Sequence, residues 1–231
     1  MDIILASGSP RRHELLTRAQ LDFRVISVDI DESPYPNEPP IEYIERMVAA
    51  KAHAAIRQLA IDYRQGVTTH CPLSDPFIIL TADTIGVLPD GKTVLVKPID
   101  REHAYSMWQH MSANTHQVWT AVQATQVSIV STSADKPNAT SHTDIIDIQC
   151  ISQQHIIECT DVTFVPLTPD MMREYWNSGE PADKAGGYGI QGLAAAWVTH
   201  IQGSYTNVVG LPLAQTLALI DKMTTSVKTK K

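Results

Sequence analysis

The stretch Ile3-Ile4-Leu5-Ala6-Ser7-Gly8-Ser9-Pro10-Arg11-Arg12 begins with a short apolar run, continues through a small polar turn and ends in a helix start. Residues 3–6 read as a buried strand. The helix predicted from Pro10 to about Ala19 has Ser9 as its N-cap and Pro10 in its first turn. A strand, a polar turn and a helix in this order are typical of an α/β fold, which is the fold class we predict.

Two segments downstream extend this pattern. Residues 23–28 predict a second strand, and the acidic, proline-rich stretch that follows, residues 29–40, is expected to be an exposed, mobile loop. From Ile41 to Leu59, apolar residues recur at helical spacing and predict a long amphipathic helix. Lys51 lies within about 60° of the centre of its apolar stripe. Such a lysine either extends its charge to solvent or reaches into a cleft.

A continuous apolar run at residues 77–80 predicts a central strand that stops at Thr81-Ala82-Asp83-Thr84. A carboxylate just past the end of such a strand lies where α/β proteins bind ligands. Residues 86–96 predict a hairpin whose turn is Asp90-Gly91, and this hairpin brings Lys97 near the end of the strand.

The rest of the chain continues in short elements. We predict helices at 100–111, 168–177 and 213–223, strands at 117–130, 156–165, 197–201 and 208–209, a glycine-rich loop at 179–192, and a polar, flexible loop at 131–143 inserted between two paired strands. The organisation is therefore one domain of two lobes over residues 1–223, followed by a basic flexible tail at 224–231.

Composition limits the possible partners. The chain has 231 residues and a formal net charge of −7, which argues against binding nucleic acid or an anionic membrane. It has no signal-peptide pattern and no run of about 18 apolar residues, so a cytoplasmic location is expected. Its cysteines and histidines lack the CxxC, HxH and HExxH spacings of metal sites. Any anionic ligand must therefore meet a local basic cluster.

The turn at residues 7–12 is a candidate phosphate cradle. A helix N-terminus presents unpaired backbone N–H groups, and Arg11 and Arg12 add two guanidinium groups beside them. The spacing GxxxxGK[ST] of a P-loop is absent. The alternative is that both arginines are solvated or form salt bridges.

Two further segments carry candidate chemistry. Asp83 and Glu32 could hold a hard cation such as Mg²⁺ together with phosphate oxygens, and Asp83 could accept a proton from water. Alternatively, Asp83 merely caps a turn. The stretch from Glu180 to Gly192 combines close-approach glycines with Lys184, Tyr188 and Gln191, which offer charge, stacking and an amide.

Together these motifs resemble the Maf family of nucleotide pyrophosphatases. The matching pieces cover most of the chain outside residues 126–155 and occur in the family's order: Ala6 to Arg12, Lys51-Ala52, Ala82-Asp83-Thr84, Lys97-Pro98, Glu180 to Gly192, and Gly203-Ser204-Tyr205 with Val208 to Pro212. The resemblance implies hydrolysis of a nucleoside triphosphate to the monophosphate and pyrophosphate. It also implies an elongated α/β fold with a mixed sheet and a central cleft, similar to the inosine triphosphatase group.

The resemblance further implies roles for individual residues. Asp83 would take the proton of a water that attacks the α-phosphorus, and Glu32 and Asp83 would lie near a Mg²⁺ or Mn²⁺ ion. The residues implied to bind the nucleotide are Ser7, Arg11, Arg12, Lys51, Thr84, Lys97, Lys184 and Gln191. A homodimer is implied in the same way.

Three of these positions, Arg11, Thr84 and Gln191, resemble the branch of the family that acts on dTTP, UTP and modified pyrimidine triphosphates. The amide of Gln191 suits a pyrimidine edge, whereas a carboxylate would suit a methylated guanine. The inserted segment 131–143 has no counterpart in the family. Two alternatives stay open: a nucleotide-sensing binding protein that restrains cell division, and a pyrophosphatase of the 7-methyl-GTP branch.

Overall fold

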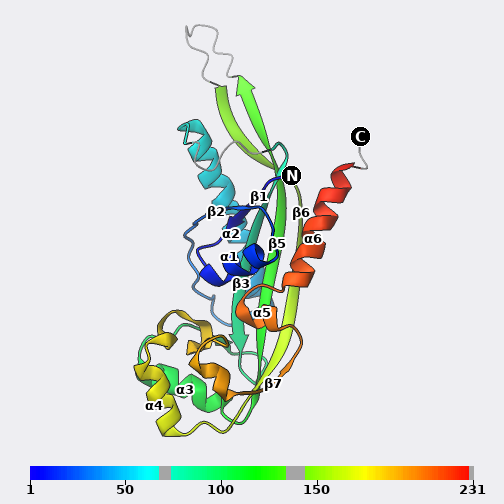
Figure 1. Cartoon of the computed structure of the whole chain (residues 1–231). Helices are drawn as coiled ribbons and strands as arrows, with labels where there is room; N and C mark the ends of the chain where they lie inside the picture. The colour runs from blue at the N-terminus through cyan, green and yellow to red at the C-terminus, as the bar shows by residue number, and fades with distance from the viewer. Residues whose placement is uncertain (68–73, 134–143, 229–231) are drawn as a thin grey trace.

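The computed structural model describes residues 1–67, 74–133 and 144–228, and Figure 1 shows an elongated molecule built along one long sheet. Within these residues the sheet has seven strands in the order β2-β1-β3-β5-β6-β7, with β4 paired to β3. The strands are β1 (Ile3–Ala6), β2 (Arg24–Ile26), β3 (Phe77–Val87), β4 (Val94–Leu95), β5 (Thr115–Ser133), β6 (Asp144–Phe164) and β7 (Val198–Gln202).

The sheet is mixed, which confirms the predicted α/β class. β1 runs parallel to β2 and β3, whereas β3, β5, β6 and β7 pair with one another antiparallel. The helices are α1 (Pro10–Arg18), α2 (Pro40–Arg64), α3 (Arg101–Met111), α4 (Pro169–Asn177), α5 (Tyr205–Val209) and α6 (Leu213–Lys228), with 3₁₀ turns η2 (Glu180–Asp183), η3 (Ala185–Gly187) and η4 (Leu193–Trp197). In the described residues no helix is both long and apolar enough to cross a bilayer.

Strand β3 is buried on both faces, which explains its continuous apolar run. Alternate residues point to opposite faces. Ile78 and Leu80 pack in the core formed with α1 and α6, and Phe77 and Ile79 pack in the core formed with α2. Figure 1 shows α2 and α6 on opposite sides of the sheet, with α3 and α4 gathered at one end. A third core, which includes Trp108 of α3, fills that end.

Helices α3 and α4 begin with a side-chain cap, and the predicted Asp90-Gly91 turn is present. Thr168 accepts a hydrogen bond from the backbone N–H of Met171 at the start of α4, and Asp100 caps α3. Gly91 has the positive φ of +70° that the hairpin turn requires. Ser9 precedes α1 in an extended conformation, but its side chain makes no capping hydrogen bond.

The prediction that the central strand stops before Asp83 is wrong. β3 continues to Val87, because β5 pairs with it in unbroken register from Phe77 onward, including Asp83 opposite Ala121. Asp83 therefore lies inside a central strand, where backbone pairing on a neighbouring strand fixes its position. A residue held in this way is not a turn cap.

Other boundaries also differ from prediction, and the strand expected at 156–165 is β6, which begins at Asp144. The expected strand at 208–209 is helix α5, because the Ser204 hydroxyl accepts a hydrogen bond from Asn207 N and caps a helix start. Helix α6 continues to Lys228, so the tail does not begin at 224. β5 extends to Ser133, so the loop predicted at 131–143 begins later. Residues 134–143 and 229–231 lie outside the described residues.

Candidate active site

A cavity of about 1020 Å³ brings the predicted site together from distant parts of the chain. Its walls come from the turn before α1, the β2–α2 connection, α2, β3, the β3–β4 hairpin, the glycine-rich loop and α5. All the residues predicted for the site line it: Ser7, Arg11, Arg12, Glu32, Lys51, Asp83, Thr84, Lys97, Lys184 and Gln191. The structure thus places these side chains in one cavity, while their chemical roles stay predictions.

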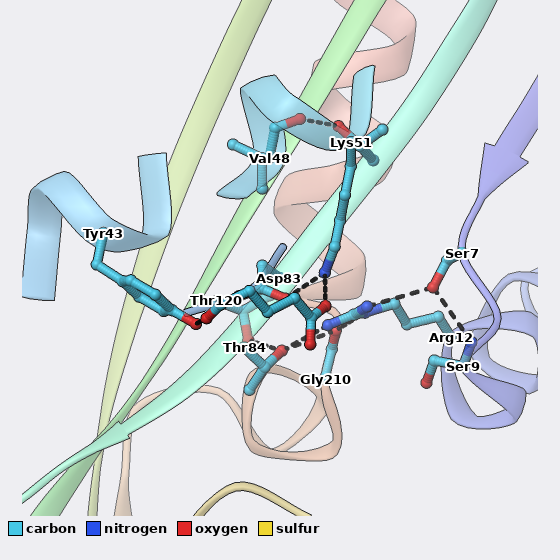
Figure 2. A network of polar contacts seen from close by, with 12 residues as sticks. Ser7, Ser9, Arg12, Tyr43, Val48, Lys51, Asp83, Thr84, Thr120 and Gly210 are labelled. Atoms are coloured by element: carbon cyan, nitrogen blue, oxygen red, sulfur yellow. Dashed lines mark hydrogen bonds and ion pairs between the residues drawn. The ribbon is translucent and has the colours of Figure 1, made fainter. Parts of the chain in front are cut away.

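Arg12 forms one wall of the cavity and is itself buried. Its Nε donates to Gly210 O at 2.8 Å, Nη1 to Ser7 Oγ at 3.2 Å and Nη2 to Thr84 Oγ1 at 3.0 Å (Figure 2). Burial lowers the pKa of Arg12 from its ordinary value, and the nearby Asp83 opposes that effect. Because an arginine pKa starts far above neutrality, the guanidinium keeps its charge. Arg12 is therefore a fixed positive charge at the cavity wall.

Thr84 connects Arg12 to α5 through a chain of hydroxyl groups. Besides accepting from Arg12, Thr84 Oγ1 lies 2.9 Å from Thr120 Oγ1, and Thr120 donates to Asn207 O at 3.0 Å. Each hydroxyl carries one proton, so a consistent arrangement has Thr84 donating to Thr120. Thr84, which was expected to help select the base, is thus also a direct support of Arg12.

Lys51 lies between two carboxylates on the other side of β3. Its Nζ is 2.6 Å from Asp83 Oδ1 and 2.9 Å from Glu32 Oε1, and Lys97 Nζ is 3.5 Å from Glu32 Oε2. Nearby, the Thr81 hydroxyl donates to Val48 O at 3.0 Å and ties α2 to β3. Of the two alternatives for Lys51, the structure shows the one in which it reaches into the cleft.

The charges around Glu32 keep its carboxylate ionised. Burial raises the pKa of Glu32, but the contacts with Lys51 and Lys97 outweigh burial, so the pKa is below its usual value. Burial, followed by the charges of Asp83 and Glu32, raises the pKa of Tyr43 to about 12. Tyr43 is therefore a neutral hydrogen-bond donor near pH 7, and it donates to Glu32 O at 2.8 Å.

The carboxylates of Glu32 and Asp83 converge on one point, the Lys51 Nζ atom. In the described part of the chain, no group of three or more His, Cys, Asp or Glu side chains could hold a metal ion. A hard cation here would therefore draw most of its oxygens from water and substrate. Mg²⁺ is usually bound in this way, through one or two carboxylates and phosphate oxygens. The residues present fit such an ion.

The glycine-rich loop is held in place by the protein behind it. Trp108 Nε1 donates to Gly186 O at 3.0 Å, and Gly189 N donates to Tyr175 Oη at 3.1 Å. Lys184 Nζ donates to Glu180 O at 2.6 Å, a contact within the loop itself. Lys184 lines the cavity, and its proposed contact with phosphate remains a prediction.

Sequence reasoning missed three residues that contact the site or its loop: Tyr43, His116 and Glu180. A Cβ on Gly192 would overlap the Glu180 carboxylate, which accepts from Leu193 N at 3.1 Å through both oxygens. The glycine at 192 was a signal that another group approaches closely. His116 on β5 is fully buried, with Nε2 2.7 Å from Tyr188 Oη, and no pattern in the sequence indicated this pair.

The fold and the cavity define an α/β protein whose site is lined by arginine and lysine side chains together with the carboxylates of Glu32 and Asp83. A family profile described as Maf-like protein matches residues 2–223, so the chain belongs to the Maf family. The relationship predicted from the motifs is therefore confirmed.

Named relatives align over nearly their whole length. The dTTP/UTP pyrophosphatase of Psychrobacter arcticus is 65% identical over 230 residues, which cover 97% of this chain and 96% of that protein. The dTTP/UTP pyrophosphatase of Pseudoalteromonas translucida is 41% identical over 218 residues, covering 94% and 95%. That of Vibrio parahaemolyticus is 38% identical over 223 residues, covering 96% and 97%.

Proposed function

We propose that the protein hydrolyses dTTP, UTP and modified pyrimidine triphosphates to the monophosphate and pyrophosphate. The observation that carries the proposal is the Asp83 carboxylate, which lies in a cavity lined by Arg12, Lys51 and Lys97. The relatives named dTTP/UTP pyrophosphatase, up to 65% identical over nearly the full length, support the same activity.

The basic side chains explain how an acidic chain binds a polyanion. Phosphoryl transfer depends mainly on positioning the triphosphate and neutralising its charge. Arg12 is buried and fixed by three hydrogen bonds, so it offers a positive charge that needs no reorganisation. Lys97 has a side chain 62% exposed, so it can move toward a bound phosphate at little cost.

Asp83 is the group that we assign to water activation. It lies on β3, paired with β5 on one side, so its position is set by the sheet. Its contact with Lys51 uses one carboxylate oxygen, and an ionised carboxylate accepts several hydrogen bonds. Capacity therefore remains for the water whose proton Asp83 takes as it attacks the α-phosphorus.

Glu32 and Asp83 are the side chains that would hold a Mg²⁺ or Mn²⁺ ion. When bound, such an ion neutralises charge on the phosphate oxygens and polarises the phosphorus. Lys51 contacts both carboxylates and is also proposed to bind the triphosphate, so it would hold the carboxylates and the triphosphate next to one another.

Selectivity for the pyrimidine is assigned to Arg11, Thr84 and Gln191, which share the cavity lining. The Gln191 amide can donate and accept at once, as the edge of uracil or thymine requires. The proposal includes a cytoplasmic location and a homodimer. Light scattering coupled to gel filtration tests the dimer.

The test of the activity is pyrophosphate release from the purified protein with Mg²⁺ or Mn²⁺. The substrates are dTTP, UTP, 5-methyl-UTP, CTP, GTP and 7-methyl-GTP. The blank is Asp83→Asn, and the control is Asp170→Asn, which changes an exposed carboxylate that does not line the cavity. Asp83→Asn is expected to lose turnover by about 10²- to 10⁴-fold while nucleotide binding is retained.

Each outcome has a clear meaning. Turnover confined to the uracil and thymine nucleotides supports both the reaction and the assignment of Arg11, Thr84 and Gln191. Turnover confined to 7-methyl-GTP assigns the protein to the other branch of the family. Binding without turnover of any nucleotide overturns the enzymatic proposal in favour of a nucleotide sensor.

A further inference from the structure

Glu32 lies in an exposed part of the site. Its side chain is 44% exposed, and it belongs to the connection between β2 and α2, residues 27–39. By contrast, Lys51 projects from a long helix and Asp83 from a central strand, and both are largely buried. Glu32 therefore needs other contacts to hold its backbone in place.

Helix α2 supplies two such contacts to neighbouring carbonyl groups. Tyr43 Oη donates to Glu32 O at 2.8 Å, and Arg46 Nη2 donates to Ser33 O at 3.0 Å. The carbonyl of Glu32 and the carbonyl of the next residue, Ser33, are thus both held by side chains of the helix that also carries Lys51. These contacts fix the direction in which the Glu32 side chain leaves the backbone.

The guanidinium of Arg46 is itself held rigidly. Its Nε and Nη2 form a bidentate pair with Glu38, with 2.6 Å to each carboxylate oxygen. Its Cζ lies 3.9 Å above the ring of Tyr35, whose backbone N–H also donates to Glu38. Bidentate geometry and ring stacking are specific to arginine, and lysine cannot reproduce them. The connection expected to be mobile is therefore held by the helix that follows it.

We propose that Arg46, together with Tyr43, is a positioning residue that holds Glu32 ready for the metal ion and the triphosphate. The proposal rests on the metal-binding role of Glu32 in the proposed function. Its physical basis is preorganisation: a carboxylate already in place loses less conformational freedom on binding than one on a free loop. Arg46 acts through Glu32 and needs no contact with the substrate.

The first test replaces Arg46 with methionine, which keeps an unbranched stem and removes every donor. Mn²⁺ binding is followed by its electron paramagnetic resonance signal with the non-hydrolysable α,β-imido-dTTP, and Mn²⁺ is also titrated in the dTTP reaction. Support for a metal ligand typically changes metal affinity by 10- to 100-fold, so we expect about a tenfold weaker affinity for Mn²⁺. We expect kcat at saturating Mn²⁺ to stay within about threefold of the parent.

Hydrogen exchange over residues 29–39 reports the positioning separately from activity. Arg46→Met is expected to speed this exchange, because the connection loses its contacts with α2. Arg46→Lys is expected to behave like Arg46→Met, since the charge alone cannot hold Glu38 and Ser33 together. Arg57→Met is the matched control, because Arg57 is an exposed residue on the same helix, and it should change neither readout.

A double-mutant cycle with Glu32→Gln tests whether Arg46 acts through Glu32. In the Glu32→Gln background, Arg46→Met is expected to add no further loss of Mn²⁺ affinity. An equal loss in both backgrounds, or unchanged exchange over 29–39, overturns the proposal. A parent protein that releases no pyrophosphate from any nucleotide contradicts the proposed function instead. In that case hydrogen exchange over residues 29–39 and Mn²⁺ binding, which need no turnover, still decide whether Arg46 positions Glu32.

Discussion

Lys51 and Asp83 form an ion pair across the contact between α2 and β3, with 2.6 Å between Nζ and Oδ1. The Lys51 side chain is 10% exposed and that of Asp83 is 14% exposed, so solvent screens the pair only in part. The group proposed to activate water is thereby paired with a residue 32 positions earlier in the chain. This pair makes the Lys51 ammonium a part of the fold as well as of the site.

Lys51→Met is expected to lower the free energy of unfolding by about 1–3 kcal/mol, because the Asp83 carboxylate loses a charged partner in a partly buried place. Urea unfolding measures this change. The control is Lys92→Met, which alters an exposed lysine of the β3–β4 turn. Nucleotide affinity should fall at the same time, and unchanged stability together with unchanged affinity would contradict the structure around Lys51.

Thr84→Val tests whether Thr84 selects the base or supports Arg12. Valine keeps the shape of the side chain but removes the hydroxyl, so Arg12 Nη2 loses an acceptor and the Thr120 hydroxyl loses a hydrogen-bond partner. We expect stability to fall by about 1–2 kcal/mol. We also expect kcat/KM for dTTP and UTP to fall, because Arg12 is held less firmly. The control is Thr115→Val, at an exposed position on β5. A weaker preference for dTTP and UTP over the other nucleotides would show that Thr84 also selects the base, as proposed, whereas an unchanged preference would limit Thr84 to supporting Arg12.

Acid should destabilise the protein partly through His116. Burial lowers the pKa of His116 to about 4, below the ordinary 6.5 of the unfolded chain. The unfolded state therefore binds more protons between these values. The contribution is fully present above pH 6.5 and is lost as the pH falls toward 4. Its full size is about 3 kcal/mol.

The measurement for His116 is urea unfolding of the parent and of His116→Gln at pH 7 and at pH 4.5. The parent should lose more stability than the variant on going to the lower pH, since glutamine does not titrate. Equal losses in the two proteins would show that His116 is not the group responsible. Because the parent and His116→Gln are compared in the same buffers, the effect of the other titrating groups, including Glu32, on the stability change is the same in both and cancels.

Gly192→Ala should disturb the glycine-rich loop, because the new Cβ would overlap the Glu180 carboxylate. Displacing that carboxylate removes the hydrogen bonds from Leu193 N, and overpacking of this kind typically costs about 1–3 kcal/mol. KM for dTTP should rise, since Gln191 is the adjacent residue. In a Glu180→Ala background the same change should cost much less. A similar cost in both backgrounds would contradict the close contact.

Much of the fold was predictable because local patterns agree with it. The strand–turn–helix at the start, the helical spacing after Ile41 and the Asp90-Gly91 turn all carry their signal within a few residues. The extent of β3 could not be predicted in the same way. Thr81 and Asp83 break the apolar run, and the strand continues because a distant partner, β5, pairs with it. Likewise, two β-branched valines are helical in α5 because Ser204 caps them.

The cavity residues were predictable as a set, while their supports were not. Glycines, arginines and carboxylates in motifs indicate chemistry directly, and they line the cavity as predicted. Arg46 resembles any polar residue on a helix until Glu38 and Ser33 are seen to contact it. His116 gives no signal because its partner, Tyr188, is 72 positions away. Residues that act through tertiary contacts leave no local pattern.

The hydrogen bond from Arg12 Nε to Gly210 O joins residues 198 positions apart, near the two ends of the chain. A growing chain that has not yet been synthesised past α5 lacks this acceptor, so Arg12 is without one of the three hydrogen bonds that fix it. The binding cavity therefore arises at the end of synthesis. A nucleotide that binds there would stabilise the finished protein and leave partly made chains unaffected.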